Sequence, residues 1–295
     1  MSKKIILLGI FMLWGALLSL QTAPLQLFTE YSPFTLLGVL GAVFANATGA
    51  GGGVVFVPFF NQLGFTPVSI VATSFAIQCC GMTAGALTWW GYYRKEKAPD
   101  AEWKMLPVSL LVAVPASLSG IWLAQFGTRA FAQLSFLQGK VDDIHLGFGV
   151  FSIILSLALF ATSLMKARPT YRSTLKGVDA VSLVIIGCIG GVLTAWLSVG
   201  VGEMVAVYLI LRGFNIAMSI AIAVILTAFT VWGAIPHHII NTMAIDWSVL
   251  MFAGLGAIIG GMIAKYVVLA FSPVKLKLFF ASWVMIMGLA GLPLF

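Results

Sequence analysis

Charged residues are scarce in this sequence. Only 8% of the 295 residues are charged, against ~25% in typical soluble proteins, while 61% are hydrophobic. A soluble fold cannot cover so much apolar surface without a charged exterior, so membrane lipid must supply most of the surroundings. The longest polar connections, 93–104, 127–144 and 166–178, are too short for folded domains. A purely soluble function is therefore excluded.

Residues that could build a metal, redox or catalytic centre are also few. Cys79, Cys80 and Cys188 lie inside apolar runs, which predicts buried packing residues and neither disulfides nor a zinc site. His237 and His238 are neighbours, and neighbouring side chains on a helix face different directions, so we expect no metal site. The sequence shows no Walker-type phosphate loop and no cluster of titratable residues. We expect no cofactor and no enzymatic activity.

Long apolar runs are what the sequence does contain. Runs of about 20 apolar residues predict seven full membrane crossings, at 5–23, 68–92, 105–126, 145–165, 214–236, 247–268 and 278–295. The first run could also be a signal peptide, but it lacks a small-x-small cleavage site, which favours a retained helix. Two further apolar segments, 34–62 and 179–211, are too long for one helix and too short for two crossings. Glycine-rich stretches interrupt both, at Asn46–Gly53 and Ser198–Glu203.

The basic residues indicate how the two interrupted segments lie. If both cross the membrane, the 16 Lys and Arg residues divide evenly between the two sides. If both are hairpins that return to their own side, 14 fall on the cytoplasmic side, and only Arg129 and Lys140 fall outside. The positive-inside rule favours hairpins, a cytoplasmic N-terminus and a periplasmic C-terminus. Because the same rule explains the net charge of +7, we expect no nucleic-acid binding.

The hairpin topology makes the two halves of the chain inverted repeats. Repeat 1 with its cytoplasmic linker covers 34–178, repeat 2 covers 179–295, and 1–33 adds an N-terminal helix and a periplasmic loop. Each repeat has one hairpin and three crossings, and an odd number of crossings inverts the second copy. With an offset near 150 the sequence pairs Gly41 with Gly191, Thr48 with Ser198 and Gly52 with Gly202. Such symmetry, with matched helix breaks, is typical of transporters. The alternative is that the glycines only let helices pack closely.

Broken helices present backbone donors inside the membrane. The half-helix after each break exposes free N–H groups with partial positive charge, and these bind anions when they line a cavity. No Lys or Arg lies inside the apolar segments away from their ends. The predicted substrate-binding residues at the breaks are Asn46, Thr48, Gly49, Gly51, Gly52, Gly53, Ser198, Gly200 and Gly202.

Several polar residues near the breaks complete the predicted site. Trp196 precedes the second break, and Thr73, Ser74, Gln78, Thr227 and Thr230 lie in the crossings that follow the hairpins. Each of these hydroxyl and amide groups is also explained by a bond between helices. Glu203 is the only acidic residue deep inside an apolar segment. An intramembrane carboxylate suggests a coupling role for a proton or cation, and the alternative is a cap of its own helix from Gly200.

The two glycine-rich stretches carry a family resemblance. The stretch Gly41–Asn61 (GAVFANATGAGGGVVFVPFFN) resembles the leading motif of the sulfite and organosulfonate exporter (TauE/SafE-type) family, and Gly190–Arg212 looks like its repeat. The resemblance implies export of small oxyanions or sulfonates across the bacterial cytoplasmic membrane. It also implies roles for Asn46, Thr48, Gly49 and Gly51–Gly53, and for Ser198, Gly200 and Gly202. Many members have glycine where this chain has Glu203.

The combined prediction is an all-α, multi-pass protein of the bacterial inner membrane. We expect a secondary transporter that exports sulfite, an organosulfonate or a related sulfur oxyanion by alternating access, with proton coupling as an option. The alternatives are an anion channel and an importer of a small sulfur-containing or carboxylate anion. The expected partners are the anionic substrate and membrane lipid. The sequence leaves the oligomeric state open, a homo-oligomer included.

Overall fold

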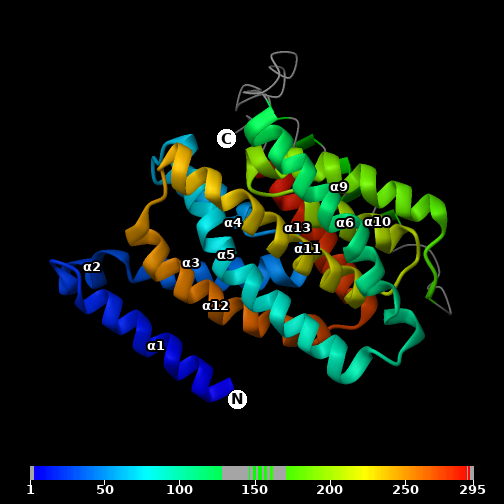
Figure 1. Cartoon of the computed structure of the whole chain (residues 1–295), viewed down its shortest axis with the longest axis horizontal. Coiled ribbons are helices and arrows are strands. Elements are labelled where there is room, and N and C mark those ends of the chain that lie inside the picture. The colour runs from blue at the N-terminus through cyan, green and yellow to red at the C-terminus, as the bar shows by residue number, and fades with distance from the viewer. Residues whose placement is uncertain are drawn as a thin grey trace.

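The computed structural model describes residues 3–127, 171–290 and 292, with scattered positions between 146 and 161. The described residues form a bundle of helices and contain no β-strand (Figure 1). The predicted crossing 145–165 lies largely outside the described residues, and the positions described within it are helical.

The main α-helices follow the predicted apolar segments closely. In chain order they are α1 (Lys3–Ser19), α2 (Pro24–Tyr31), α3 (Pro33–Thr48), α4 (Gly53–Gln62), α5 (Pro67–Tyr92), α6 (Met105–Trp122), α9 (Gly177–Leu197), α10 (Val201–Leu211), α11 (Ile216–His237), α12 (Trp247–Ala270) and α13 (Pro273–Ala290). Short π-helical turns, η1 (Tyr93–Lys97), η3 (Leu123–Gly127) and η5 (His238–Thr242), extend α5, α6 and α11, and a 3₁₀ turn, η2 (Ala101–Trp103), precedes α6.

Four of the seven predicted crossings, 68–92, 105–126, 214–236 and 247–268, correspond to described helices that are long and apolar enough to cross a membrane. In the described part of the chain, five helices are long and apolar enough to cross a membrane, namely α5, α6, α9, α11 and α12 with their extensions. A sixth span exists only if α1 and α2 are counted together, although they are bent by 119°. The predicted crossing 5–23 corresponds largely to α1, which ends at Ser19. The chain leaves α1 after Ser19, and α2 restarts at Pro24, whose fixed φ suits a first helical position.

Two central helices, α5 and α11, organise the bundle. Their apolar windows are 72% and 78% buried, which is more than any other span. They run antiparallel, because Phe75 stacks on His238 near one end while Gly85 meets Val224 further along. Helices α3 and α12 run parallel to α5, and α6 and α9 run parallel to α11, as their successive contacts show.

The outer helices pack on each other through small residues. In the α3–α12 pair, a Cβ added at Gly260 would collide with the carbonyl oxygen of Val39. In the α6–α9 pair, a Cβ at Gly120 would collide with the carbonyl oxygen of Cys188. Backbones that approach so closely need glycine at the contact. The two pairs therefore have the same construction, and each joins a helix of the first half of the chain to one of the second.

A buried carboxylate fastens the amino end of α9. Asp179 is fully buried, and its oxygens lie 2.9 Å from Arg172 Nη2 and 2.6 Å from Arg212 Nε. The Tyr208 hydroxyl donates to the same carboxylate at 3.0 Å, as does the Lys176 N–H. The network joins the segment before α9 to α10 and to the turn that follows it.

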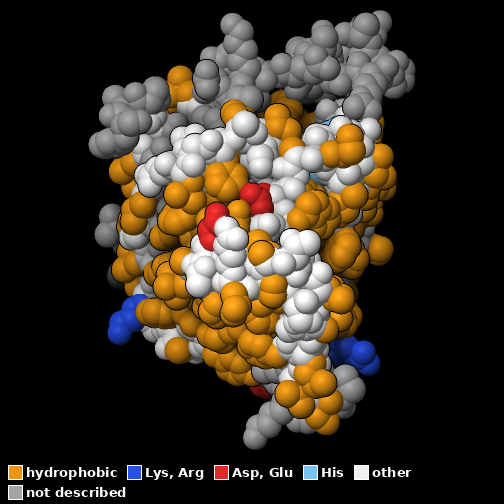
Figure 2. All heavy atoms as spheres, turned by 90° about the vertical axis from the view of Figure 1, so that its left-hand side faces the viewer, with side chains coloured by type: hydrophobic (Ala, Val, Ile, Leu, Met, Phe, Trp, Pro, Cys, Tyr) orange, Lys and Arg blue, Asp and Glu red, His pale blue; other side chains and the backbone are white. Residues whose placement is uncertain are grey.

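The outside of the bundle is largely apolar. Hydrophobic side chains cover most of the face in Figure 2, and Lys and Arg appear at its two sides. Large apolar side chains such as Leu111 (76% exposed) and Val181 (60%) project outward from α6 and α9. A lipid environment accounts for this surface.

Candidate functional site

The first break lies between α3 and α4. Helix α3 ends at Thr48, and Gly49 takes the left-handed conformation (φ 77°) while its N–H bonds to the Ala45 oxygen at 2.8 Å. The chain then reverses, because the Phe56 ring of α4 packs on Gly41 of α3. Glycine enters the left-handed region without strain, which explains a sharp helix end at this position.

The second break, between α9 and α10, repeats this geometry. Ser198 occupies the left-handed position (φ 59°), and its N–H bonds to the Thr194 oxygen at 2.9 Å. Helix α10 starts at Val201 and folds back on α9, where Val201 packs on Gly190. A serine with positive φ is uncommon, so the surrounding contacts must hold it there.

The two breaks touch each other directly. A Cβ at Gly53 would collide with the Ser198 carbonyl oxygen, and a Cβ at Gly202 would collide with the Gly49 carbonyl oxygen. These contacts are equivalent, since Gly53 and Gly202, like Gly49 and Ser198, are 149 residues apart. The predicted pairs Thr48 with Ser198 and Gly52 with Gly202 were therefore wrong by one residue. The glycines let the backbones of the two breaks approach within contact distance.

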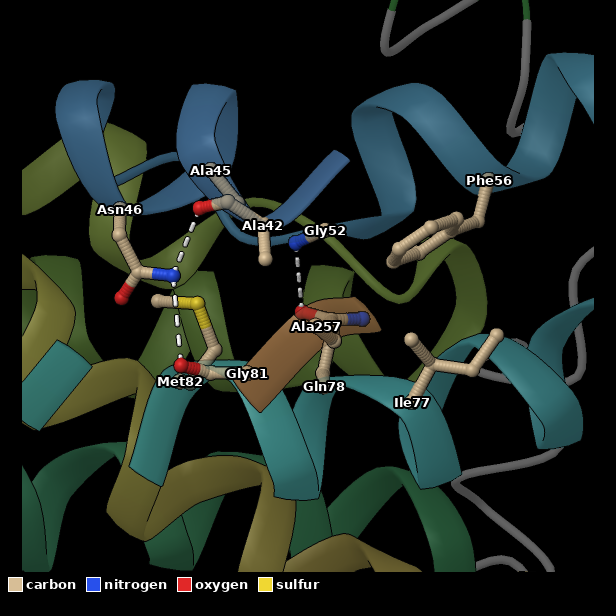
Figure 3. A pocket seen from close by; sticks show the side chains of 10 residues that line it. All are labelled: Ala42, Ala45, Asn46, Gly52, Phe56, Ile77, Gln78, Gly81, Met82 and Ala257. Atoms are coloured by element: carbon tan, nitrogen blue, oxygen red, sulfur yellow. Dashed lines mark hydrogen bonds between the residues drawn. The ribbon is translucent and has the colours of Figure 1, made fainter. Parts of the chain in front are cut away.

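Gln78 of α5 joins the two breaks. Its Oε1 accepts a hydrogen bond from Gly52 N–H at 2.9 Å, as Figure 3 shows. Its Nε2 lies 2.9 Å from the Ser198 carbonyl oxygen, 2.7 Å from Ser198 Oγ and 3.2 Å from Ser74 Oγ. Ser198 Oγ in turn donates to Ser74 Oγ at 3.0 Å. All these side chains are buried, so one amide group ties both breaks to the central helix.

The residue equivalent to Gln78 in the other half has a polar group without a hydrogen-bond partner. Thr227 of α11 lies 149 residues after Gln78 and is also buried, but its hydroxyl has no hydrogen-bond partner. It packs against Gly51 of the first break and Gly202 of the second. In one half, Gln78 and Ser74 face Ser198. In the other half, Thr227 lies beside Gly202 and Ala223 lies beside Gly49. Polar groups are therefore concentrated on one side of the contact.

Asn46 and Thr48 stand beside the first break. Asn46 Nδ2 donates to the Ala42 oxygen at 2.8 Å, and its buried Oδ1 has no partner (Figure 3). Thr48 Oγ1 donates to the Phe44 oxygen and accepts from Ala50 N–H. The cavity between Asn46, Gly52 and Gln78 has no room for a water molecule, so the site is closed in this conformation.

The other predicted residues lie at different distances from the breaks. Trp196 packs beside Ala50 and Val199, at the edge of the contact. The Thr73 hydroxyl accepts from Asp246 N–H at 2.9 Å, which links α5 to the start of α12. The Thr230 and Ser117 hydroxyls are 2.8 Å apart and link α11 to α6. Thr73 and Thr230 thus bond between helices, the alternative that the sequence had left open.

Glu203 lies in the first turn of α10 and is only 2% exposed. Its Oε2 has no hydrogen-bond partner, and no bond to the Gly200 N–H is present. A buried carboxylate oxygen without a partner is costly, so this residue is not explained as a cap of its own helix.

The sequence analysis did not identify Asp179 or Lys265 as notable residues. Asp179 was placed at a segment end, and its partner Arg212 is 33 residues away, so only the folded chain reveals the network. Lys265, near the end of the predicted crossing 247–268, was counted only among the cytoplasmic charges, and it is 8% exposed on α12. The described residues contain no group of three or more His, Cys, Asp or Glu side chains that could hold a metal ion.

The fold and the surface define a multi-pass membrane protein with a closed contact between two broken helices at its centre. The profile of the family described as "Sulfite exporter TauE/SafE" matches residues 34–291, and the chain belongs to this family. Membership implies a membrane transporter of sulfur anions. No curated protein and no solved structure matches the chain.

Proposed function

We propose that the protein is a secondary transporter that exports a small sulfur oxyanion, sulfite or an organosulfonate, across the bacterial cytoplasmic membrane. The observation that carries the proposal is the contact between the two breaks, which Gln78 bridges. In alternating access, this contact opens toward one side at a time and the substrate binds between the breaks.

Gln78 forms hydrogen bonds with groups at the breaks that could bind an oxyanion. Its Oε1 accepts from Gly52 N–H, which is the kind of backbone donor that binds anion oxygens at a helix start. Binding of the anion would replace this contact and release Gly52 from Gln78. Release would also free Ser198, which Gln78 holds from the other side. Substrate binding and separation of the breaks would thus be one event.

Matching contacts support the proposal of inverted repeats. Helices α3, α4, α5 and α12 correspond to α9, α10, α11 and α6, and members of each pair run in opposite directions when their contacts are followed along the chain. The turns after α4 and α10 also match, since Phe65 N–H bonds to Phe60 and Phe214 N–H to Leu209. Helix α6 of repeat 1 thus packs against α9 and α11 of repeat 2, and α12 of repeat 2 packs against α3 and α5 of repeat 1.

The second candidate is an anion channel with the same half-helices. The closed cavity at the breaks favours the transporter, because an open pore needs a continuous water path. An importer would use the same site with the opposite driving gradient. Flux measurements separate the three.

We expect proteoliposomes containing the protein to carry sulfite or an organosulfonate with saturable kinetics. The panel is sulfite, thiosulfate, taurine, sulfoacetate and acetate, and flux is measured from each side. Gln78→Leu, of similar size, cannot bond to Gly52 or Ser198 and should reduce the rate about tenfold or more, corresponding to ~1.4 kcal/mol. Gln62→Leu, which changes an exposed glutamine of α4, is the control. Large unsaturable currents would favour the channel, and no anion flux would reject both.

Accessibility to a membrane-impermeant thiol reagent tests the predicted orientation. In a cysteine-free background, cysteines at Lys95 and Lys176, both exposed, should be labelled only from the cytoplasmic side. A cysteine at Gln62, at the other end of the bundle, should be labelled only from outside. Labelling of the first two from opposite sides would contradict the inverted arrangement.

A further inference from the structure

Lys265 is a buried cation without a counterion in the described part of the chain. It lies on α12 and is 8% exposed, and no carboxylate among the described residues forms a salt bridge with it. Its ammonium nitrogen lies 4.7 Å from the ring centroids of both Tyr92 and Tyr266. Aromatic faces stabilise a cation only partly, and buried charges are otherwise paired.

A buried donor without a partner belongs to the same cluster. Trp89 is fully buried, and its indole N–H has no hydrogen-bond partner. Its ring lies 6.0 Å from that of Tyr92, the residue beneath the Lys265 ammonium. A charged donor and a neutral donor packed against one tyrosine are the kinds of group that bind oxyanions.

The cluster lies between the proposed substrate site and one end of the bundle. Ala257 lines the closed cavity at the breaks, and Lys265 follows it on α12 by about 12 Å, at about 1.5 Å per residue. Val268 and Leu269, which share the face of Lys265 one turn later, line a cavity of about 140 Å³. This is the end that the charge distribution places in the cytoplasm.

The other half of the molecule lacks the cation. Helix α12 corresponds to α6 with an offset of 140 residues, as two pairs of contacts show. Ala257 of α12 contacts Gly81, and Ser117 of α6 contacts the equivalent Thr230. Gly260 of α12 contacts Val39, and Gly120 of α6 contacts the equivalent Cys188. The position equivalent to Lys265 is therefore Gln125, and that of Trp89 is His238. Both are buried, with Gln125 Oε1 and both His238 ring nitrogens unpartnered. Among the described residues, the position equivalent to Lys265 thus carries no fixed positive charge.

We propose that Lys265, Trp89 and Tyr92 form an inner anion site, at which a small oxyanion is held before it enters the closed contact between the breaks. The identity of the ligand rests on the proposed function, and the site itself rests on the cluster. The site gives the cytoplasmic side the higher affinity, because the equivalent outer position offers only neutral groups.

Sulfite kinetics measured from each side test the inner anion site. In inside-out vesicles, Lys265→Gln should raise the half-saturating sulfite concentration about tenfold with little change in maximal rate, since one charge-assisted contact is lost. In right-side-out vesicles it should keep the wild-type value. Lys275→Gln, which removes an exposed lysine of α13, should change neither. An equal rise on both sides, or no rise, would overturn the site.

Binding to the purified protein gives a measurement that does not require transport. Sodium sulfite should raise the melting temperature of the wild type, and Lys265→Gln should lose most of that shift. Trp89→Phe removes only the indole donor and should lose a smaller part of the shift in melting temperature. This variant tests the site if Lys265→Gln does not fold. Sulfite binding that depends on Lys265 in a protein without anion flux would reject the proposed function and keep the site. A shift in melting temperature that Lys265→Gln retains, or no shift in the wild type, would overturn the inner anion site.

Discussion

Gly202→Ala is expected to reduce anion flux about a hundredfold or more. The added methyl group would meet the Gly49 carbonyl oxygen and the Thr227 hydroxyl. The carbonyl belongs to the main chain and cannot move away by a side-chain rotation, so the two breaks must separate. Overpacking of this kind typically costs about 1–3 kcal/mol of stability, and here it also displaces Gly51 and Gly52 from their contacts. Sulfite flux in proteoliposomes and the melting temperature of the purified protein measure both effects.

Controls for Gly202→Ala separate contact between the breaks from a general effect of removing glycine. Gly91→Ala lies in α5, where an added methyl group would meet nothing within 4 Å, and should keep normal flux. Gly53→Ala, the equivalent change in the first break, should be as harmful as Gly202→Ala because it meets the Ser198 carbonyl oxygen. The double variant Gly202→Ala, Thr227→Ala should not recover, since the clash with Gly49 remains. Wild-type flux in Gly202→Ala would show that the breaks need no contact.

Local signals in the sequence were enough to locate the breaks. The glycine-rich stretch at Asn46–Gly53 predicted an interruption, and α3 ends at Thr48 while α4 begins at Gly53. Helix termination depends on neighbouring residues, chiefly one that accepts a left-handed conformation. The break at Ser198 follows the same rule, although serine supplies the left-handed residue there.

Contacts between distant segments could not be obtained from the sequence. At the breaks, the contact of Gly53 with Ser198 defines the register of the repeats, where the sequence had matched residues one position away. Gln78 was a candidate as a polar residue in a crossing, but its partners Gly52 and Ser198 come from opposite halves. The end of α1 is different, since Pro24, directly after the predicted run 5–23, was a local signal for a new helix start.

The two breaks have similar backbone geometry and different side chains. Ser74, Gln78 and Ser198 form a polar group on one side of the contact, while Gly49, Ala223 and Thr227 take the equivalent positions on the other. The residue equivalent to Glu203 in the first half is Val54. A symmetric backbone can alternate between two orientations, and asymmetric side chains make the two orientations chemically different. We therefore expect any coupling to an ion gradient to act through the second half.

Glu203→Gln is expected to remove the response of transport to a proton gradient. The Glu203 carboxylate follows Gly202 on α10 and is buried with Oε2 unpartnered, so we expect a proton or a bound cation to compensate its charge. Glutamine has nearly the same shape without the charge, so downhill exchange of sulfite should persist while an imposed pH difference no longer changes its rate. Flux is measured in proteoliposomes with and without that difference. Glu96→Gln, which changes an exposed residue of η1, should keep the wild-type response. A gradient response that Glu203→Gln retains would assign coupling to another group.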